Sequence, residues 1–474
     1  MKILLTGTTG YIGQRLLPAL LADGHEVVCC VRDRKRFDEE KYHSDRVKVI
    51  ELNFLDGDSL EIIPDDIEAA YYLIHSMSSN NEDFEILEKK SAENFCKRIQ
   101  KTDTKQVIYL SGIINDQNLS KHLESRKSVE KILSSADFHL TTLRAGIILG
   151  SGSASFEIIR DLVEKLPVMI APKWLDTKSQ PLASRNVIEY LKGVLLNEYT
   201  FDKSFDIGGP EILTYKDMLL KFAKVRNLKR TIITVPVMTP KLSSYWLYFV
   251  TSTSFTLASN LVKSMGVEII CRENDLKERL GIKLLTYEEA IHLAFEKIQN
   301  AEVVSSWKDA LSSKVLGEGI SKLVNIPTFG CYTDIRETKV YDENASLEKI
   351  WSIGGKNGWY YANWLWGIRG FIDKLFGGVG LRRGRKNSKL IFAGDSLDFW
   401  RVLYANKAEK RLLLYAEMKL PGEAWLEFRI SDNILQQTAT FRPLGLMGRL
   451  YWYAVLPFHG FIFSGMMKKI ASAK

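Results

Sequence analysis

The sequence has few cysteines and no segment typical of an exported protein. Five cysteines are spread over 474 residues, and no two of them form the C-x-x-C pair of a zinc or redox site. An odd number of scattered thiols is typical of a reduced cytosolic protein and argues against a disulfide framework. The opening residues, MKILLTG, have a short apolar run but no signal-peptide cleavage site. We therefore expect a cytoplasmic protein that holds no structural metal.

Excess charge of one sign and long apolar runs are also missing. The 65 Lys and Arg residues nearly balance the 57 Asp and Glu residues, and the net charge of +8 is spread along the chain. This balance gives no indication of nucleic-acid binding. The most apolar stretch, residues 450–466, is interrupted by Pro457, His459 and Gly460. We expect it to form a buried terminal helix rather than a membrane anchor.

What remains is a globular composition, 46% hydrophobic and 26% charged, with enough chain for two or three domains. In the N-terminal half, strand-like runs alternate with amphipathic stretches such as residues 11–22 and 84–99. The strand-like runs are residues 2–5, 26–31, 47–52, 69–74, 106–110 and 140–148. Apolar strands that alternate with helices predict a parallel sheet covered on both faces, the α/β doubly wound class.

A second domain is indicated by a shift in composition. Seven of the ten tryptophans follow residue 325. The pattern there predicts a strand and a short helix, then several strands and a long apolar helix from about residue 446, which is an α+β unit. We predict a first domain over residues 1–310, with a substrate-side lobe over 151–310, and a second domain over 325–474.

The sharpest local motif is TGTTGYIG, between the first predicted strand and the first predicted helix. A glycine-rich turn lets the backbone approach a diphosphate closely, and the helix N-terminus offers N–H groups to it. The context therefore predicts a dinucleotide site. Its expected contacts are the whole turn: Gly7, Thr8, Thr9, Gly10, Tyr11, Ile12 and Gly13.

The end of the second predicted strand bears on the choice of coenzyme. In NAD-binding units an acidic residue at this place accepts the ribose hydroxyls. Here the strand ends with Arg32, whose guanidinium can pair with a 2′-phosphate, and the pattern therefore favours NADP. Asp33 is the rival, because its carboxylate can accept from the ribose if Arg32 points into solvent.

Several motifs besides the Gly7-x-x-Gly10-x-x-Gly13 spacing bear on the family of this chain. They are AYYLIHSM, VIYLSG, SRKSVEKIL, TTLRAGIILGSGSASFE, FDIGGPEILTY, VPVMTPKLSSYW, GGVGLRRGR, LDFWRV, AEMKLPGEAWLEF and LPFHGFIF. With them the sequence resembles the atypical and extended short-chain dehydrogenase/reductases, in particular the NmrA-like NAD(P)-binding group, which implies a Rossmann-type fold. The tail resembles a domain of unknown function that is fused to such bacterial reductase-like domains.

The resemblance implies roles at further positions. Asn53 stands where the family meets the adenine, and Ile74, His75 and Ser76 border the cofactor path. Ser111 stands where catalytic members polarise a carbonyl with a hydroxyl, and Lys127 lies approximately at the position of the active-site lysine.

One departure concerns the reaction itself. The family's catalytic tyrosine belongs four residues before the lysine, where this chain has Leu123. A leucine cannot exchange a proton with a substrate oxygen. Another group would have to serve, or the domain binds its cofactor without ordinary carbonyl reduction. The available groups are His75, His122, Tyr109 and Tyr245.

Two features of the C-terminal domain remain. For the basic cluster at residues 382–386, RRGRK, a solvated loop is favoured over contact with an anionic ligand or an acidic membrane surface. The order of elements is similar to that of START-type helix-grip folds, which enclose an apolar cavity. That analogy suggests Trp400, Trp425 and His459 as cavity lining.

Three hypotheses follow. The first is an NADP-dependent oxidoreductase acting on a hydrophobic small molecule, in which Ser111 and Lys127 orient the reacting groups. The second is a non-catalytic NADP(H) sensor or assembly factor, and the third is a carrier of hydrophobic ligands.

Overall fold

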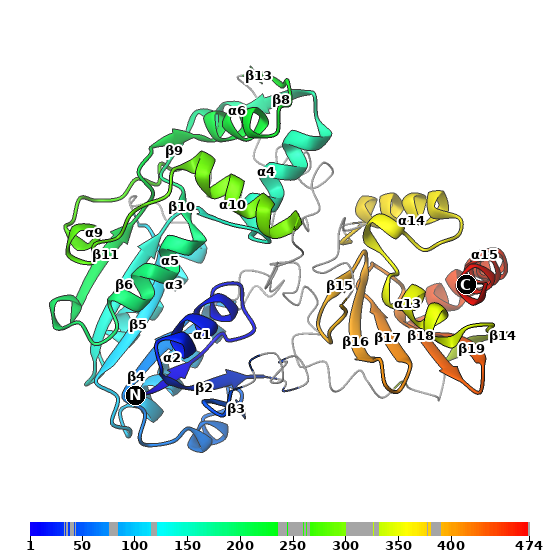
Figure 1. Ribbon diagram of the computed structural model, residues 1–474, viewed down its shortest axis with the longest axis horizontal. Coiled ribbons are helices and arrows are strands. Elements are labelled where there is room, and N and C mark those ends of the chain that lie inside the picture. The colour runs from blue at the N-terminus through cyan, green and yellow to red at the C-terminus, as the bar shows by residue number, and fades with distance from the viewer. Residues whose placement is uncertain are drawn as a thin grey trace. The chain divides into compact units, whose positions relative to one another are not determined.

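The computed structural model describes residues 1–32, 34, 37, 42, 44–74, 84–114, 121–235, 244, 259, 262, 266–299, 326, 331–376, 378–380 and 390–472. The chain divides into two compact units. The first unit comprises Met1–Thr251 and Thr256–Ala310, and the second comprises Ser252–Phe255 and Leu311–Lys474. Figure 1 labels their elements along the chain.

A seven-stranded sheet forms the centre of the first unit, in the order β11-β6-β5-β4-β1-β2-β3. Every pair of neighbours in it is parallel. Because β1 lies between β4 and β2, the chain changes direction across the sheet at this strand, which is where α/β folds bind ligands. The strands are β1 (Lys2–Leu5), β2 (Glu26–Val31), β3 (Val47–Glu51), β4 (Ala69–Tyr72), β5 (Gln106–Gly112), β6 (His139–Ala145) and β11 (Lys203–Ile207).

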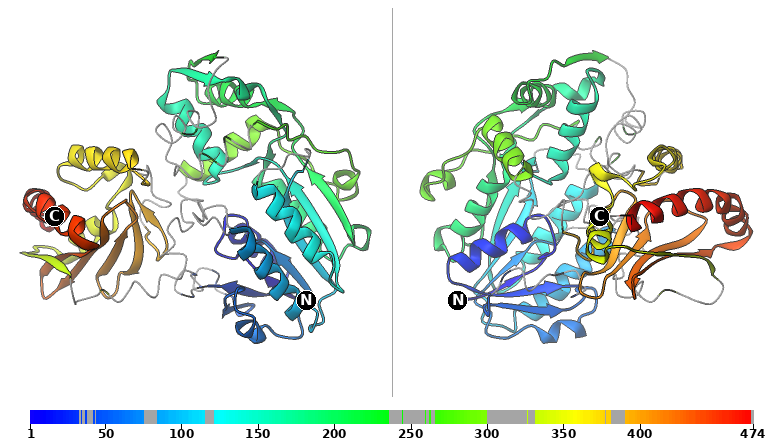
Figure 2. Two further views of the ribbon diagram at one scale, coloured as in Figure 1. Left: turned by 180° about the vertical axis from the view of Figure 1, so that it is seen from behind. Right: turned by 45° about the vertical axis from the view of Figure 1, so that its right-hand side comes forward.

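Helices cover both faces of this sheet, as Figures 1 and 2 show. Alternate residues of each strand face opposite ways: Ile3 and Leu5 pack with α1 (Gly13–Ala22) and α5 (Ser184–Gly193), whereas Leu4 packs with α2 (Phe84–Ile99) and α3 (Lys121–Leu133). Each side is a continuous apolar cluster. The predicted Rossmann-type doubly wound sheet is confirmed.

The remaining described elements of the first unit are short strands and helices that follow β6. Three two-stranded pairings, β10 with β7, β12 with β9 and β13 with β8, connect them. The elements are β7 (Ile148–Leu149), α4 (Ala154–Lys165), β8 (Val168–Pro172), β9 (Lys178–Ser179), β10 (Leu182–Ala183), β12 (Leu213–Thr214), α6 (Tyr215–Val225), β13 (Thr231–Val235), α9 (Leu276–Arg279) and α10 (Tyr287–Gln299), with 3-10 turns at Asp58–Ile62, Lys173–Asp176 and Glu198–Thr200.

The second unit contains an antiparallel sheet in the order β14-β19-β18-β17-β16-β15. Its first strand therefore pairs with its last, and a long terminal helix follows, an order consistent with the helix-grip arrangement. The predicted α+β class is confirmed. The elements are β14 (Tyr332–Lys339), α13 (Glu343–Trp351), a 3-10 turn at Gly355–Asn357, α14 (Asn363–Leu375), β15 (Ser396–Leu397), β16 (Trp400–Asn406), β17 (Arg411–Ala416), β18 (Gly422–Ser431), β19 (Ile434–Pro443) and α15 (Gly445–Ala471).

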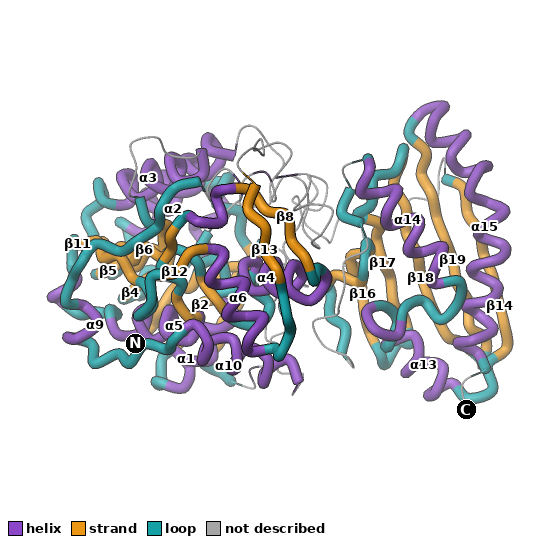
Figure 3. Tube along the Cα trace, turned by 90° about the horizontal axis from the view of Figure 1, so that it is seen from above, coloured by secondary structure: helices purple, strands orange, loops and turns teal. Residues whose placement is uncertain are grey.

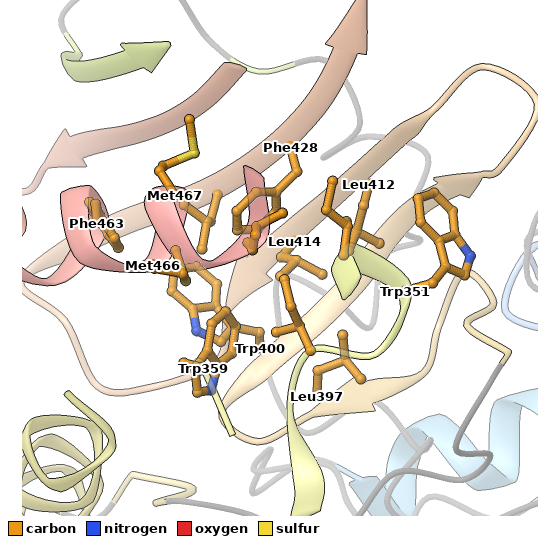
Figure 4. Packing of buried hydrophobic residues seen from close by; sticks show 14 of the residues in the cluster. Trp351, Trp359, Leu397, Trp400, Leu412, Leu414, Phe428, Phe463, Met466 and Met467 are labelled. Atoms are coloured by element: carbon orange, nitrogen blue, oxygen red, sulfur yellow. The ribbon is translucent and has the colours of Figure 1, made fainter. Parts of the chain in front are cut away.

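The core of this unit lies between the sheet and helices α13, α14 and α15, which Figure 3 shows over the strands. Large side chains from both layers interdigitate there, as Figure 4 shows. Trp359 stacks on Trp366 at 4.9 Å between ring centroids, and its indole N–H donates to Asp398 at 2.8 Å. Met466 and Phe428 are fully buried in the same cluster.

The opposite face of the sheet carries a separate cluster, and it corrects one prediction. Trp425 packs there with Leu403, Leu413 and Tyr415, because it alternates along β18 with residues that face the core. Trp425 therefore cannot share a cavity lining with Trp400, which belongs to the core cluster.

A fully buried ion pair stands at the edge of the sheet. The Arg401 guanidinium donates to both carboxylate oxygens of Glu417, at 2.9 and 3.1 Å, and to the Gly394 carbonyl at 2.7 Å. Neither side chain of the pair has any exposed surface.

Two helices of this unit differ from expectation. Helix α14 falls in a segment for which the sequence predicted no element, and α15 buries one side only rather than being a buried terminal helix. Among the described residues, no helix combines the length and the hydropathy needed to cross a membrane.

Candidate functional site

The glycine turn connects β1 to α1 and leaves no room for side chains. Gly7 has a φ of 62°, and a Cβ on it would lie 2.4 Å from the Leu73 carbonyl oxygen, next to the end of β4. A Cβ on Gly13 would lie 2.4 Å from the Gly7 carbonyl oxygen. The first residue of α1 therefore rests directly on the turn, and only glycine permits that approach.

The N-terminus of α1 is not capped by its own side chains. Its N-cap residue, Ile12, makes no capping hydrogen bond, and the first turn contains no acidic residue. By contrast, Ser153, Thr214 and Asp342 cap α4, α6 and α13. The N–H groups of Gln14 and Arg15 already donate to the Gly10 and Ile12 carbonyls, at 3.1 and 3.0 Å. What this end of the helix offers to an anion is therefore the positive end of its dipole and the backbone of the turn before it.

Thr8 and Thr9, within the glycine turn, have hydrogen-bond partners in the chain itself. The buried Thr8 hydroxyl donates to the Leu5 carbonyl at 2.8 Å, and the Thr9 carbonyl accepts from the Gln14 amide at 2.9 Å. These bonds hold the turn against β1 and α1. A hydrogen bond donated by Thr8 to a ligand would therefore come from its backbone.

Tyr11 and Arg15 join the turn to the segment after β7, which the sequence did not predict. The Arg15 guanidinium lies 3.9 Å from the centre of the Tyr11 ring and donates to the Ser151 carbonyl at 2.6 Å. Burial raises the pKa of the Tyr11 hydroxyl, which lies beside Ser184. The start of the lobe predicted over 151–310 is thereby held against the dinucleotide-binding edge of the sheet.

Arg32 and Asn53 follow β2 and β3 at the same edge. Both are exposed. The Asn53 side-chain oxygen accepts from the Leu55 N–H at 3.1 Å, which fixes a local turn and leaves its amide nitrogen as the group that could meet a base. Asp33, the rival of Arg32, lies outside the described residues.

The end of β4 is described only in part. Ile74 is half-buried two residues after the strand, whereas His75 and Ser76 lie outside the described residues. Because the strands are parallel, the residues that follow β1, β2, β4 and β5 share one edge of the sheet. Ile74 thus lies on the side of the sheet where the glycine turn lies.

The candidate catalytic residues belong to β5 and α3. Ser111 is buried on β5, and Leu123 lies beside this strand, since a Cβ on Gly112 would come within 2.9 Å of its Cδ2 atom. Lys127 is exposed on α3. The place of the missing tyrosine is therefore next to the end of β5, and it holds an apolar side chain.

Of the four alternative proton donors, Tyr109 is the one whose side chain the structure describes. Tyr109 is buried between the sheet and the α2–α3 layer, its hydroxyl donates to the Arg126 carbonyl at 3.4 Å, and burial raises its pKa. Tyr245 and the side chain of His122 lie outside the described residues, as does the basic cluster at 382–386.

A charge network beside these residues, largely buried except for the exposed Arg272, was not predicted. On α3, Glu130 pairs with Arg144 of β6 at 2.5 Å, and Asp206 of β11 accepts two bonds from Arg272 at 2.8 and 2.9 Å. Arg144 also lies 3.9 Å from Asp206. The sequence signal was an arginine within the strand-like run 140–148 and an aspartate within KSFDI. The network fixes the side of α3 that carries Lys127 against two neighbouring strands.

Comparison with family models divides the chain in the same way. Residues 7–162 match a family described as NAD(P)H-binding, and residues 330–466 match a protein family of unknown function, DUF2867. The comparison with curated proteins found no match.

Several solved structures are similar to this chain in fold. The triphenylmethane reductase of Citrobacter sp. is 15% identical with a TM-score of 0.52, over 62% of this chain and 100% of the reductase. A nucleoside-diphosphate-sugar epimerase from Staphylococcus aureus is 14% identical with a TM-score of 0.50, over 61% and 99% of the two chains. The Bordetella bronchiseptica enzyme WbmG, solved with NAD, is 14% identical with a TM-score of 0.50, over 64% and 96%. At these identities the likeness concerns the fold alone.

Proposed function

We propose that this chain, which joins an NAD(P)H-binding domain to a DUF2867 domain, is an NADP(H)-dependent oxidoreductase acting on a hydrophobic small molecule. The observation that carries the proposal is the turn from Gly7 to Gly13. A Cβ at either of these positions would lie 2.4 Å from a carbonyl oxygen, and the helix that follows has no capping side chain. Such a turn suits a diphosphate, which needs close approach to bare backbone and is attracted by the positive end of a helix dipole.

The residues present fit a dinucleotide. The turn would hold the diphosphate, Arg32 the 2′-phosphate and the Asn53 amide the adenine. When bound, NADPH supplies the hydride. The chain's own part would be to position the nicotinamide end with the residues after β4 and β5, among them Ile74 and Ser111, and to keep water from it with the buried side chains around β5.

Arg32 provides the sharpest test of coenzyme choice. We expect calorimetric titration of the full chain to show tighter binding of NADPH than of NADH. Arg32→Ala should weaken NADPH binding by about 10- to 100-fold, which corresponds to about 1.5–3 kcal/mol for charge-assisted hydrogen bonds, and should leave NADH binding unchanged. Arg46→Ala is the matched control, because it removes an exposed arginine from the other end of β3.

Two outcomes would refute parts of this proposal. If Arg32→Ala weakens both coenzymes equally, or neither, then Arg32 does not select the 2′-phosphate. If the folded chain takes up neither NADPH nor NADH, the dinucleotide site itself is wrong.

A second candidate is the non-catalytic NADP(H) sensor, and Leu123 favours it. The apolar side chain stands where the family places its proton donor, and the exposed Lys127 has no phenol beside it at that position. A panel of quinones, enones and aldehydes decides between the two. If any of these compounds oxidises NADPH, and Ser111→Ala lowers the rate, the result supports the enzyme. Tight coenzyme binding without turnover supports the sensor.

The third hypothesis, a carrier of hydrophobic ligands, has less support. Trp425, one of the three residues suggested as cavity lining, faces away from the core of the second unit. The core itself is filled by interdigitated side chains such as Trp359, Phe428 and Met466. An apolar molecule that copurifies with the full chain, and that binds again after extraction, would support the carrier hypothesis.

A further inference from the structure

Helix α14 exposes its apolar side. Along it Trp364, Ile368, Phe371, Ile372 and Leu375 follow the i, i+4, i+7, i+8, i+11 spacing of one helix face, and they are exposed by 64, 48, 58, 40 and 57%. The opposite face, with Trp366, Gly370 and Asp373, is buried. This is the reverse of an ordinary surface helix, in which the apolar stripe faces the core.

Helix α15 has the same arrangement over its first two thirds. Leu446, Leu450, Tyr453 and Phe461 lie on one side and are exposed by 71, 55, 61 and 52%. The other side packs on the sheet through a set of buried residues. These are Trp452 in the first two thirds and Phe463, Met466, Met467 and Ile470 in the last third. The helix is thus held by one face and leaves the other for a partner.

The two helices belong to one layer. Trp366 of α14 lies 6.3 Å from Phe463 of α15 between ring centroids, and Tyr361, just before α14, lies 5.1 Å from Phe461. Both bury their inner sides in the same core. Their outer sides, which we call the outward face of α14 and α15, therefore point away from the sheet (Figure 3).

The exposed charges on the two helices themselves have one sign. Helix α15 contains no acidic residue, and the single acid of α14, Asp373, is fully buried and accepts from two backbone N–H groups. The basic side chains of the two helices are Arg369, Lys374, Arg449, Lys468 and Lys469. The next charged run along the sequence after α14 is the basic cluster at 382–386.

We propose that the outward face of α14 and α15 binds the surface of a membrane that contains anionic lipids. Exposed apolar area of this extent marks an interaction site. Tryptophan, tyrosine, phenylalanine and leucine with flanking lysine and arginine are the side chains that enter the headgroup boundary of a bilayer. Two copies of the chain would bring like charges together on this face, whereas anionic headgroups complement them. The proposal goes beyond the oxidoreductase function, since it does not depend on the coenzyme.

Flotation of the full chain with vesicles tests this directly, without coenzyme. One set of vesicles is phosphatidylcholine alone, and the other is phosphatidylcholine with an equal part of phosphatidylglycerol. We expect the protein to float with the second set and much less with the first. Added salt should release it, because the attraction between surface charges is screened.

Substitutions locate the contact. Trp364→Gln with Phe371→Gln removes the stripe on α14, and Leu446→Gln with Leu450→Gln removes the stripe on α15. Each pair should lower vesicle binding by roughly tenfold or more. Lys468→Gln with Lys469→Gln should lower binding to the anionic vesicles by roughly tenfold, and hardly change binding to phosphatidylcholine. Ile86→Gln is the control, since Ile86 is 65% exposed on a helix of the first unit.

Several results would overturn the proposal. One is the absence of flotation with either vesicle. Another is flotation that both stripe variants retain. A loss of flotation in only one of the two variants would refute a face that α14 and α15 form together. Light scattering that shows a dimer, which the stripe variants dissolve while vesicles bind nothing, would assign the face to a second copy. Circular dichroism of each variant confirms that it is folded.

Discussion

Replacing Gly13 with alanine should damage the coenzyme site while most of the fold persists. The added methyl carbon would lie 2.4 Å from the Gly7 carbonyl oxygen and 3.0 Å from the Thr8 Cα atom. Both neighbours are backbone atoms, so neither can rotate away. Relief of the contact requires α1 to move away from the turn by about 1 Å, because methyl groups pack at roughly 3.5–4.0 Å from other heavy atoms.

The size of the effect follows from two opposing contributions. Overpacking of this kind typically costs about 1–3 kcal/mol. Alanine is the better helix former by up to about 1 kcal/mol. We expect a net loss of about 1–2 kcal/mol of stability in the first unit. Displacement of the helix N-terminus from the diphosphate should weaken NADPH binding by roughly tenfold or more.

Gly367→Ala is the matched control. Gly367 lies inside α14, and a Cβ on it would meet nothing within 4 Å. This variant should bind NADPH as the parent does and gain about 0.5–1 kcal/mol of helix stability. Calorimetric titration gives the two affinities, and circular dichroism during heating gives the two stabilities.

The argument about the turn is refuted by one clear result. If Gly13→Ala is folded and binds NADPH as tightly as Gly367→Ala does, then close contact between α1 and the turn does not form the coenzyme site. A loss of binding in both variants would instead point to a defect unrelated to the turn.

Two further predictions concern the second unit, whose seven tryptophans report its unfolding in urea. Burial lowers the pKa of His459 from 6.5 to about 4, with Asp334 opposing the shift and Arg336 adding to it. The unfolded chain therefore takes up a proton as the pH falls below about 6.5 while the folded unit does not, so stability falls by about 2–3 kcal/mol toward pH 4, and His459→Phe should lack this part of the decline. Arg401→Met leaves the buried Glu417 without its guanidinium and should cost about 3–5 kcal/mol, whereas Arg401→Met combined with Glu417→Leu should cost far less.

A different result would contradict each of these two predictions. An equal decline with pH in the parent and in His459→Phe would show that the imidazole titrates alike in the folded and unfolded states. For the ion pair, a double variant as unstable as Arg401→Met would show that packing, not the stranded carboxylate, determines the loss. Arg429→Met, an exposed arginine on β18, serves as the control for charge removal.

The first unit could be predicted closely because its signals are local. The bounds of β1, β2 and α2 agree with the predicted ranges 2–5, 26–31 and 84–99 to the residue. The run 140–148 was predicted as one strand, but the structure ends β6 at Ala145 and places Ile148 in β7. Between them lies Gly146, at which a Cβ would come within 2.8 Å of Ile269. That contact comes from a residue over a hundred positions away and has no local signal.

The second unit shows where a periodic pattern misleads. Helix α14 has its apolar residues at helical spacing, yet two glycines and the crowded aromatics hid it, and the stripe faces outward. Trp364 and Trp366, only two residues apart, lie on different faces of this helix, the first exposed and the second buried. Trp425 was misplaced because its face depends on strand register, which the sequence did not supply.

The candidate site was only partly accessible from sequence. The glycine turn follows from spacing alone, and its geometry agrees with the close backbone approach expected there. The pairing of Glu130 with Arg144 and of Asp206 with Arg272 joins segments up to 66 positions apart. Such pairs can be recognised only once the strand order is known. The roles assigned to Ser111, Lys127 and Asn53 stay predictions.

The order of strands in the second unit also constrains when it can form during translation. Strand β14 pairs along its whole length with β19, about a hundred residues later, and the Ser346 hydroxyl donates to the Ile470 carbonyl, 124 positions away. The large sheet of the first unit is complete at Ile207. A ribosome that has exposed that residue can already carry every strand of this sheet. The second unit must wait until β19 and α15 have been synthesised, with β14 meanwhile an open edge that nascent-chain chaperones would have to shield.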